Sequence, residues 1–307
     1  MQRVYGAMRT KRTSLLFMAA AIAVPLMMDA QTRRSGRSFS SSIDENGPVT
    51  NCGEIHVTYD RRPAITEESD MTLPHSQVST LRVQLSNEGI YLSGWDRDEY
   101  SIKTCKAVPG DDPSAASRLR EITTSNANGQ ITVNGPTGVE WAANLIIMTP
   151  RLSALDLQTR NGPMQLRDLA GNIQLSAANG PIRLNNVGGI VQATTTNGPI
   201  SVTRASGDQR LTATNGPMQV TLSGNRWDGP GLVASTQNGP LAVSVPDAYG
   251  SGIQVQVSDH SPVSCKASVC VGAARSLSSL GMIRLGNGEP IVRLSTVNGP
   301  LSIQAAR

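Results

Sequence analysis

The chain has 307 residues, of which 38% are hydrophobic, 16% charged and only 3% aromatic, and its formal net charge is +4. With so few aromatic residues, a core has to be built from Leu, Ile, Val, Met and Ala, which suits thin layers that stack regularly. Basic residues are not interleaved with aromatic ones. The composition therefore gives no support to a nucleic-acid-binding protein, and we expect no nucleic-acid partner.

Residues 1–30 have the pattern of a secretory signal peptide. Basic residues precede the apolar run SLLFMAAAIAVPLMM, and Ala30 marks the expected cleavage point. The run is short for a membrane span and contains Pro25, so a cleaved signal is favoured over a retained anchor. Cleavage removes four basic residues and one acidic residue, which lowers the net charge from +4 to +1. We expect an exported chain in the periplasm, at the cell surface or outside the cell, without an integral membrane span after cleavage.

Residues 31–51 predict a flexible leader, and residues 52–77 predict an N-terminal cap region. The leader contains the basic patch TRRSGR, which reads as a solvated tail in preference to a site for an anionic partner. The cap region begins with a strand-like EIHVTY and continues with charged residues and prolines. Such residues are typical of a segment that protects the open edge of a sheet.

The four cysteines of an exported chain predict disulfides. Cys265 and Cys270 are close enough in sequence to close a loop, which leaves Cys52 to pair with Cys105. Three pairings of four cysteines are nevertheless open at this stage. A zinc site is disfavoured because the thiols are scattered and no paired histidines accompany them, so we expect neither a metal nor a cofactor.

The main feature of the sequence is the triplet Asn-Gly-Pro, which between Asn161 and Asn215 returns every 18 residues. A fixed period of this kind describes a repeat architecture and does not describe a reaction. The triplets begin at Asn46, Asn134, Asn161, Asn179, Asn197, Asn215, Asn238 and Asn298.

Apolar residues occupy fixed slots around each triplet. One slot precedes the triplet, and two slots that are two residues apart follow it. The residue between the two slots is polar in most units. This alternation has the period of a β-strand that has one buried and one solvent-exposed face. The slots hold Leu157, Leu175, Ala193, Leu211, Ala234 and Leu294 before the triplet, and Met164/Leu166, Ile182/Leu184, Ile200/Val202, Met218/Val220, Leu241/Val243 and Leu301/Ile303 after it.

The flanking strands of a triplet have two ways to pair. Asn-Gly between alternating strands ordinarily indicates a β-hairpin. Here proline follows, and it lacks the N–H that closes a two-residue hairpin and biases the preceding glycine toward extended geometry. We therefore predict an all-β fold, a parallel β-solenoid or β-helix of two-strand coils of about 18 residues, in which each strand pairs with the next coil.

Each triplet then forms a corner of a coil. Asn tolerates a left-handed conformation, Gly takes any conformation, and Pro starts the next strand in a new direction. The four regular asparagines would lie in register and form a ladder of amides. The predicted corner residues are Asn161, Gly162, Pro163, Asn179, Gly180, Pro181, Asn197, Gly198, Pro199, Asn215, Gly216 and Pro217.

The predicted solenoid domain spans residues 78–307. The stretch LRVQLSNEGIYLSGW, residues 81–95, repeats the pattern with Asn-Glu-Gly at its corner. The triplet is missing between Val245 and Pro290, and there the sequence predicts wider or irregular coils before the final unit.

Over residues 78–307 the chain resembles the bacterial envelope family named "putative adhesin", a domain of unknown function. Three features carry the resemblance: a Gly-Trp-Asp turn at 94–96, a proline after the aliphatic strand LIIMTP, and the closing IVRLSTVNGPLSIQ. The resemblance implies an exported β-solenoid on or near the cell surface. The invariant proline of the triplets goes beyond the Asn-Gly of that family.

The sequence contains no nucleophile elbow, phosphate-binding loop, zinc-protease motif or calcium loop. The carboxylates of WDRDEY and PGDDPS read as solvated turns, although a calcium site at Asp96, Asp98 and Glu99 is an alternative. Asp156 and Asp168 belong to one coil, on opposite sides of its corner, and no acid stands one repeat away from either. Paired carboxylates of a polysaccharide-cleaving enzyme are therefore disfavoured.

We accordingly expect a non-catalytic module of the cell envelope that mediates adhesion or binds a surface ligand. The ligand is a glycan, a cell-wall polymer or an envelope protein. The alternative is an envelope sensing or scaffold domain that binds a protein partner. A β-helix enzyme that acts on a polysaccharide is the third interpretation. Trp95, Trp141 and Trp227 are scattered and read as packing residues in preference to sugar platforms.

Overall fold

The computed structural model describes residues 38–43, 47–86, 88–259, 261–271, 282–286 and 288–306. The predicted signal peptide, part of the leader and the asparagine of the first triplet lie outside the described residues. Two disulfides join Cys52 to Cys105 and Cys265 to Cys270, which is the pairing that the spacing favours. Among the described residues, no helix combines the length and the apolar character needed to cross a membrane.

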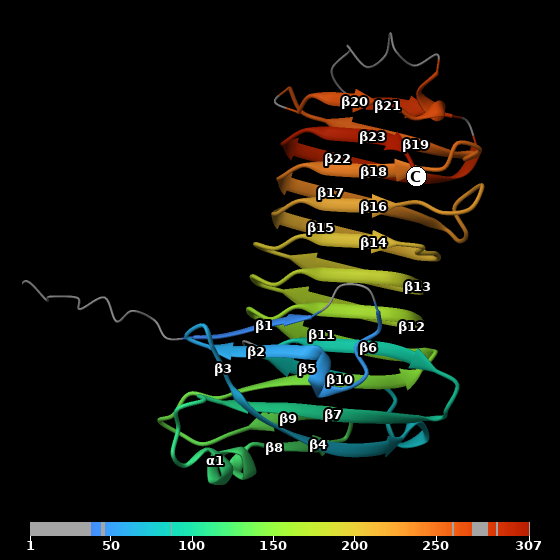
Figure 1. Cartoon of the computed structure of the whole chain (residues 1–307). Helices are drawn as coiled ribbons and strands as arrows, with labels where there is room; N and C mark the ends of the chain where they lie inside the picture. The colour runs from blue at the N-terminus through green and yellow to red at the C-terminus, as the bar shows by residue number, and fades with distance from the viewer. Residues whose placement is uncertain are drawn as a thin grey trace, which may run out of the picture. The chain divides into compact units, whose positions relative to one another are not determined.

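The described chain is all-β. It contains one α-helix, α1 (Ala115–Glu121), and three single turns of 3-10 helix, η1 (Cys52–Glu54), η2 (His75–Gln77) and η3 (Ser268–Cys270). Its strands form a small antiparallel sheet and a large mixed sheet (Figure 1). The small sheet consists of β1 (Phe39–Ile43), β2 (Ile55–Tyr59) and β3 (Arg62–Pro63).

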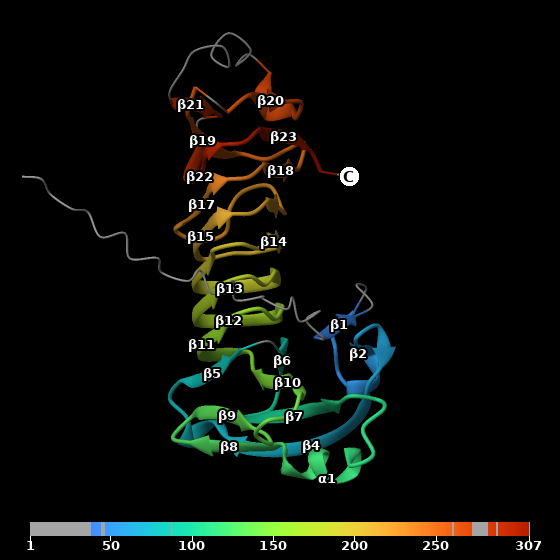
Figure 2. The same cartoon turned by 90° about the vertical axis from the view of Figure 1, so that its left-hand side faces the viewer.

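Most strands of the large sheet stack in two rows, which Figure 2 shows side by side. Neighbouring strands within each row are parallel. In spatial order, row A contains β5 (Leu81–Leu85), β11 (Leu152–Thr159), the second halves of β12 (Met164–Ala177) and β13 (Ile182–Thr195), β15 (Asp208–Asn215), β17 (Gly231–Asn238), β22 (Gly288–Asn298) and β19 (Ser251–Val257). Row B contains β6 (Ile90–Trp95), the first halves of β12 and β13, β14 (Ile200–Thr203), β16 (Met218–Thr221), β18 (Leu241–Val245), β23 (Leu301–Ala305) and β20 (Val263–Cys265).

Each repeat unit pairs with the next one along the chain. In β12 and β13 the register joins Met164 to Ile182 and Leu175 to Ala193, one repeat apart. The Met164 N–H donates to the carbonyl of Pro181 at 2.9 Å, so proline, which has no N–H, still takes part in the ladder as an acceptor. The two strands that flank a triplet lie in different rows, and the hairpin alternative is therefore wrong.

The apolar slots around the triplets form the core between the rows, as the alternation predicts. All of them are buried; Leu157, Met164 and Ile182, for example, are 0% exposed. A single unit cannot cover these side chains by itself, because it forms only one layer of the stack. Stacking of successive units is therefore what removes their apolar area from water, at roughly 25 cal/mol per Å².

The order of strands in space differs from the order in sequence at the C-terminal end of the stack. Strands β22 and β23 lie between β17/β18 and β19/β20 (Figure 1). Residues 245–290 were expected to form coils that precede the final unit in the stack. That prediction is wrong, because β19 and β20 lie beyond the final unit. The outermost strand there is β21 (Met282–Leu285), which pairs antiparallel with β19.

At the N-terminal end of the stack one more parallel strand is added to each row, and antiparallel strands follow it. In row B, β10 (Ala142–Pro150) follows β6, then β7 (Glu99–Val108), then β4 (Ile65–Pro74). In row A, β9 (Gln130–Asn134) follows β5 and pairs with β8 (Thr123–Ala127). β4 pairs with β7 along its length and carries exposed Glu67, Glu68 and Asp70, and such charges discourage further strand pairing.

The corners use left-handed residues, but not where the sequence predicts them. The asparagines of the described triplets do not have positive φ. Positive φ occurs at the opposite corner of each unit, at Asp168, Asn186 and Arg204, again 18 residues apart. The glycines three residues later, Gly171, Gly189 and Gly207, have φ of 140°, 86° and 88°. In these units positive φ therefore belongs to the looser corner, and among the described triplet residues only Gly299 has it, with φ of 155°.

Candidate functional site

The predicted corner asparagines form a continuous ladder of amides. Each side-chain Nδ2 donates to the Oδ1 of the asparagine one unit before it: Asn179 to Asn161 at 2.7 Å, and Asn197 to Asn179 at 2.8 Å. The ladder continues through Asn215 and Asn238 to Asn298, although 60 residues separate the last two in sequence. These amides stabilise one another, and this edge of the stack is structural.

The predicted corner glycines are required by a close approach of neighbouring backbones. A Cβ added at Gly198 would overlap the carbonyl oxygen of Gly180 and lie 2.8 Å from its carbonyl carbon. Gly180 has the same relation to Gly162, and Gly216 to Gly198. The repeat alone does not give the distance between successive corners, so this reason cannot be predicted from the sequence.

The outward positions of the rows carry polar side chains in register. In row A, Gln174, Gln192 and Arg210 are neighbours on adjacent strands, and so are Ser176, Thr194 and Thr212. Adjacent strands are about 4.8 Å apart, so these side chains form two regular polar lines. In row B the outward line runs through Gln165, Arg183, Ser201 and Gln219.

The carboxylates near the Gly-Trp-Asp turn each face a different basic side chain. Asp96 accepts from Arg151 Nε at 2.6 Å, Asp98 lies 2.8 Å from His75 Nδ1, and Glu99 lies 3.6 Å from Arg97. The hydrogen bond and the charge of Arg151 lower the pKa of Asp96 below its ordinary value. In the part of the chain that the structure describes, three or more metal-ligating side chains do not meet at any point.

The other acids singled out in the sequence do not come together either. Asp156 points outward from row A and is bonded to Gln158, whereas Asp168 lies at the opposite corner and accepts from Asn186 at 2.7 Å. Asp112 pairs with Arg118 at 2.5 Å, and Asp111 lies 3.9 Å from Arg62. Each carboxylate therefore has a local structural partner.

The tryptophans pack locally. Trp227 is 4% exposed and its Nε1–H donates to Gly207 at 2.8 Å, and Trp95 donates to Glu99 while Arg97 lies over its ring. Trp141 packs against the backbone of Gly135, where an added Cβ would meet the indole ring. These contacts fix the turns in which the tryptophans occur.

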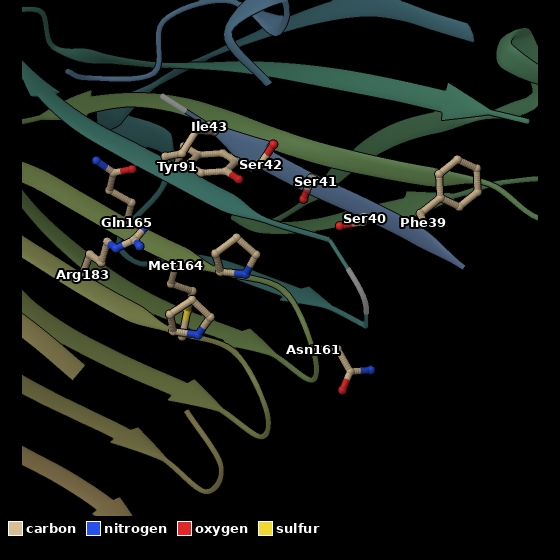
Figure 3. A pocket seen from close by; sticks show the side chains of 12 residues that line it. Phe39, Ser40, Ser41, Ser42, Ile43, Tyr91, Asn161, Met164, Gln165 and Arg183 are labelled. Carbon is tan, nitrogen blue, oxygen red and sulfur yellow. The ribbon is translucent and has the colours of Figure 1, made fainter. Parts of the chain in front are cut away.

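A pocket of about 410 Å³ lies between strand β1 and the outer surface of row B (Figure 3). Its floor is formed by Tyr91, Gln165 and Arg183, which are register neighbours on β6, β12 and β13. Its wall is the edge of β1 with Ser40, Ser41 and Ser42. Pro163 and Met164 of one corner, together with Pro181 and Phe39, add apolar surface.

The floor of this pocket holds two buried polar groups. Tyr91 is 2% exposed and Gln165 is 8% exposed. Among the described residues, Gln165 Oε1 has no hydrogen-bond partner, whereas the Tyr91 hydroxyl lies near the Ser41 hydroxyl of β1. Burial raises the pKa of Tyr91, and the nearby Ser41 hydroxyl and the positive charge of Arg183 oppose that shift.

The sequence pattern does not predict this pocket. Gln165 and Arg183 occupy outward slots of the repeat, where the pattern predicts exposure, and Tyr91 lies in the aliphatic stretch of β6. Strand β1 buries this part of row B, and the apolar side chains of Val57, Ala107 and Ile146 pack around Tyr91. The signal that sequence offers is modest: Tyr91 is the aromatic member of an otherwise polar outward line.

No protein-family model and no curated protein matches the chain. Among solved structures it is similar to a "putative cell adhesion protein" from Clostridium sporogenes, at 9% identity and a TM-score of 0.29, over 79% of this chain and 100% of that one. A "putative adhesin" from Bacteroides fragilis is 10% identical, with a TM-score of 0.32, over 79% and 97% of the two chains. A "putative lipid binding protein" from Parabacteroides distasonis is 9% identical, with a TM-score of 0.31, over 78% and 96%.

With identities and TM-scores this low, these similarities assign neither a family nor a ligand to the chain. The resemblance to the adhesin family over residues 78–307 stays a prediction from its motifs.

Proposed function

We propose that the protein is an exported, non-catalytic module of the cell envelope, built as a parallel β-solenoid, that binds a surface ligand. The ladder pairing at steps of one repeat and the burial of every apolar slot support the solenoid. The observation that carries the function is the pair of polar lines on row A. Gln174, Gln192 and Arg210, together with Ser176, Thr194 and Thr212, repeat along the outer surface.

These lines suit a long ligand with repeated polar groups. Gln174, Gln192, Arg210, Ser176 and Thr212 are exposed, and they repeat at the strand spacing of about 4.8 Å. Their backbones are held by strands on both sides, so little conformational entropy is lost on binding. Each contact is weak on its own, but a polymer makes many of them along the stack. A glycan or a cell-wall polymer fits this description better than a compact molecule.

Exposed side chains of row A give the test. The protein is applied to arrays of glycans and cell-wall polymers, beside a variant in which Gln174, Gln192 and Arg210 are replaced by Ala. Because these residues are exposed, the variant should fold as stably as the wild type, within about 0.5 kcal/mol per site. We expect the wild type to be retained on at least one polymer and the variant to be retained more weakly.

A matched control replaces Ser201 and Gln219 of row B by Ala, and it should leave retention unchanged. Retention that is equal in all three proteins contradicts the assignment to row A. If no polymer retains the protein and one envelope protein is instead recovered by pull-down, the sensing or scaffold role replaces the proposed function.

A further inference from the structure

One outward line of row A carries three exposed arginines toward the C-terminal end of the stack. It crosses β15, β17, β22, β19 and β21, which Figure 2 shows one above another. The residues of this arginine line are successive register neighbours, and all of them except the half-buried Gln254 are exposed. In spatial order they are Arg210, Val233, Arg293, Gln254 and Arg284.

The arginines occupy every second strand of the arginine line. Because adjacent strands lie about 4.8 Å apart, the strands of successive arginines lie about 9.6 Å apart. An uncharged residue stands at each strand between them, Val233 at the first and Gln254 at the second. The line therefore presents positive charge at a regular spacing, with no acidic side chain among its five positions.

The positive charge of the arginine line is only partly balanced within the protein. Among the described residues, Arg293 has no ion-pair partner. Arg210 Nη2 lies 3.2 Å from Asp208 Oδ2, and Arg284 Nη2 lies 3.4 Å from Glu289 Oε1. Both pairs are exposed to solvent, where an ion pair is weak. A guanidinium group has five N–H donors, so each arginine keeps donors for a ligand.

We infer that the arginine line binds an acidic glycan that carries a negatively charged group on every second sugar. An extended linear glycan advances by about one strand spacing per sugar ring, so two rings span the step between two arginines. A guanidinium group binds a carboxylate through two parallel N–H donors. The sugar between two acidic sugars lies over Val233, which is 38% exposed and suits the C–H face of a ring. At the next step it lies beside the amide of Gln254.

The inference deepens the proposed function and rests on it. Gln174 and Gln192 precede Arg210 on the same outward line, so a glycan along the arginine line continues onto the residues to which the proposed function assigns binding. The new element is the charge of the ligand and its spacing. A neutral polymer leaves three guanidinium groups without a ligand partner, whereas an acidic glycan of this repeat provides one for each.

The test titrates three hexasaccharides into the full chain, purified with its disulfides intact, by calorimetry at low salt. A hyaluronan hexamer carries a carboxylate on every second ring, a galacturonate hexamer carries one on every ring, and an N-acetylglucosamine hexamer is neutral. The variant is Arg293→Gln, which removes the central charge of the arginine line. The matched control is Arg120→Gln, which removes the same charge from an exposed position of α1, outside both rows.

We expect the hyaluronan hexamer to bind at least as tightly as the galacturonate hexamer, although it has half the charge, because its carboxylates match the arginine spacing. The neutral hexamer should bind most weakly. Arg293→Gln should weaken hyaluronan binding about 1.5- to 5-fold, as the loss of one exposed ion pair implies, and leave the neutral hexamer unaffected. Arg120→Gln should leave every affinity unchanged.

The contrary outcomes separate the inference from the proposed function. Tighter binding of the galacturonate hexamer, or an equal effect of Arg293→Gln and Arg120→Gln, overturns the inference, because spacing along the arginine line would then not matter. If the neutral hexamer binds as tightly as hyaluronan, or if only arrayed polymers retain the protein, the inference fails while the proposed function stands. If neither the hexamers nor the arrayed polymers bind, both fail.

Discussion

Replacing Gly198 by Ala tests how the units are held together. The added Cβ would overlap the Gly180 carbonyl oxygen, lie 2.8 Å from its carbonyl carbon, and lie 3.0 Å from Thr195 Oγ1. Thr195 Oγ1 itself donates to the Gly180 carbonyl, so neither neighbour is free to move away. Overpacking typically costs about 1–3 kcal/mol, and a clash with backbone belongs at the upper end, at about 3 kcal/mol.

Thermal unfolding measures this cost. For a domain of this size, 1 kcal/mol shifts Tm by roughly 2–4 °C, so Gly198→Ala should lower Tm by about 6–12 °C. The matched control is Gly47→Ala, which lies in the same Asn-Gly-Pro sequence but has no atom within 4 Å of the added Cβ. Gly47→Ala should leave Tm nearly unchanged. Equal shifts for the two variants would refute the argument that the corner glycines are required by the neighbouring backbone.

Three further predictions concern stability. Asn197 both donates and accepts in the amide ladder, whereas Asn298 is seen only to donate, so Asn197→Ala should lower the free energy of unfolding in urea by about 1–2 kcal/mol, roughly twice the effect of Asn298→Ala. Equal effects would show that the ladder hydrogen bonds do not contribute to stability. Burial raises the pKa of Tyr249 to about 12, so its contribution to stability is complete below the unfolded pKa of about 10 and is lost as the pH rises towards 12. Tyr249→Phe should flatten the loss of stability in that window, and an unchanged slope would be contrary to this assignment. Replacing both Cys52 and Cys105 by Ser should cost about 4 kcal/mol, against about 2 kcal/mol for Cys265 and Cys270, because the first pair closes the longer loop, 53 residues against 5. A larger loss for the second pair would contradict the loop-length reasoning.

The sequence was sufficient to predict the features that recur in every unit: the buried apolar slots, the pairing between units and the asparagine ladder. The alternation around each triplet shows which side chains are buried. Pro163, Pro181 and Pro199 lack the N–H that a hairpin needs, so the flanking strands pair with the next unit instead. Equal spacing then brings Asn161, Asn179, Asn197 and Asn215 into one ladder. These features are local or periodic, so a single chain displays them.

The remaining features depend on contacts that no local pattern encodes. The place of β19 and β20 beyond the final unit is set by tertiary pairing, since residues 246–290 lack the triplet. The burial of Tyr91 and Gln165 depends on β1, which lies far from both in sequence. The corner glycines are identified by the repeat, but the reason for them is a distance between units that appears only in the structure.

The central claim is that the stack binds a polymer of the cell envelope without reacting with it. The most direct measurement incubates the protein with a polymer that retains it and then quantifies polymer length and new reducing ends. We expect the protein to be retained and the polymer length to stay unchanged. Shortening of the polymer that disappears in Asp156→Asn or Asp168→Asn would contradict it, because those carboxylates would then act in catalysis.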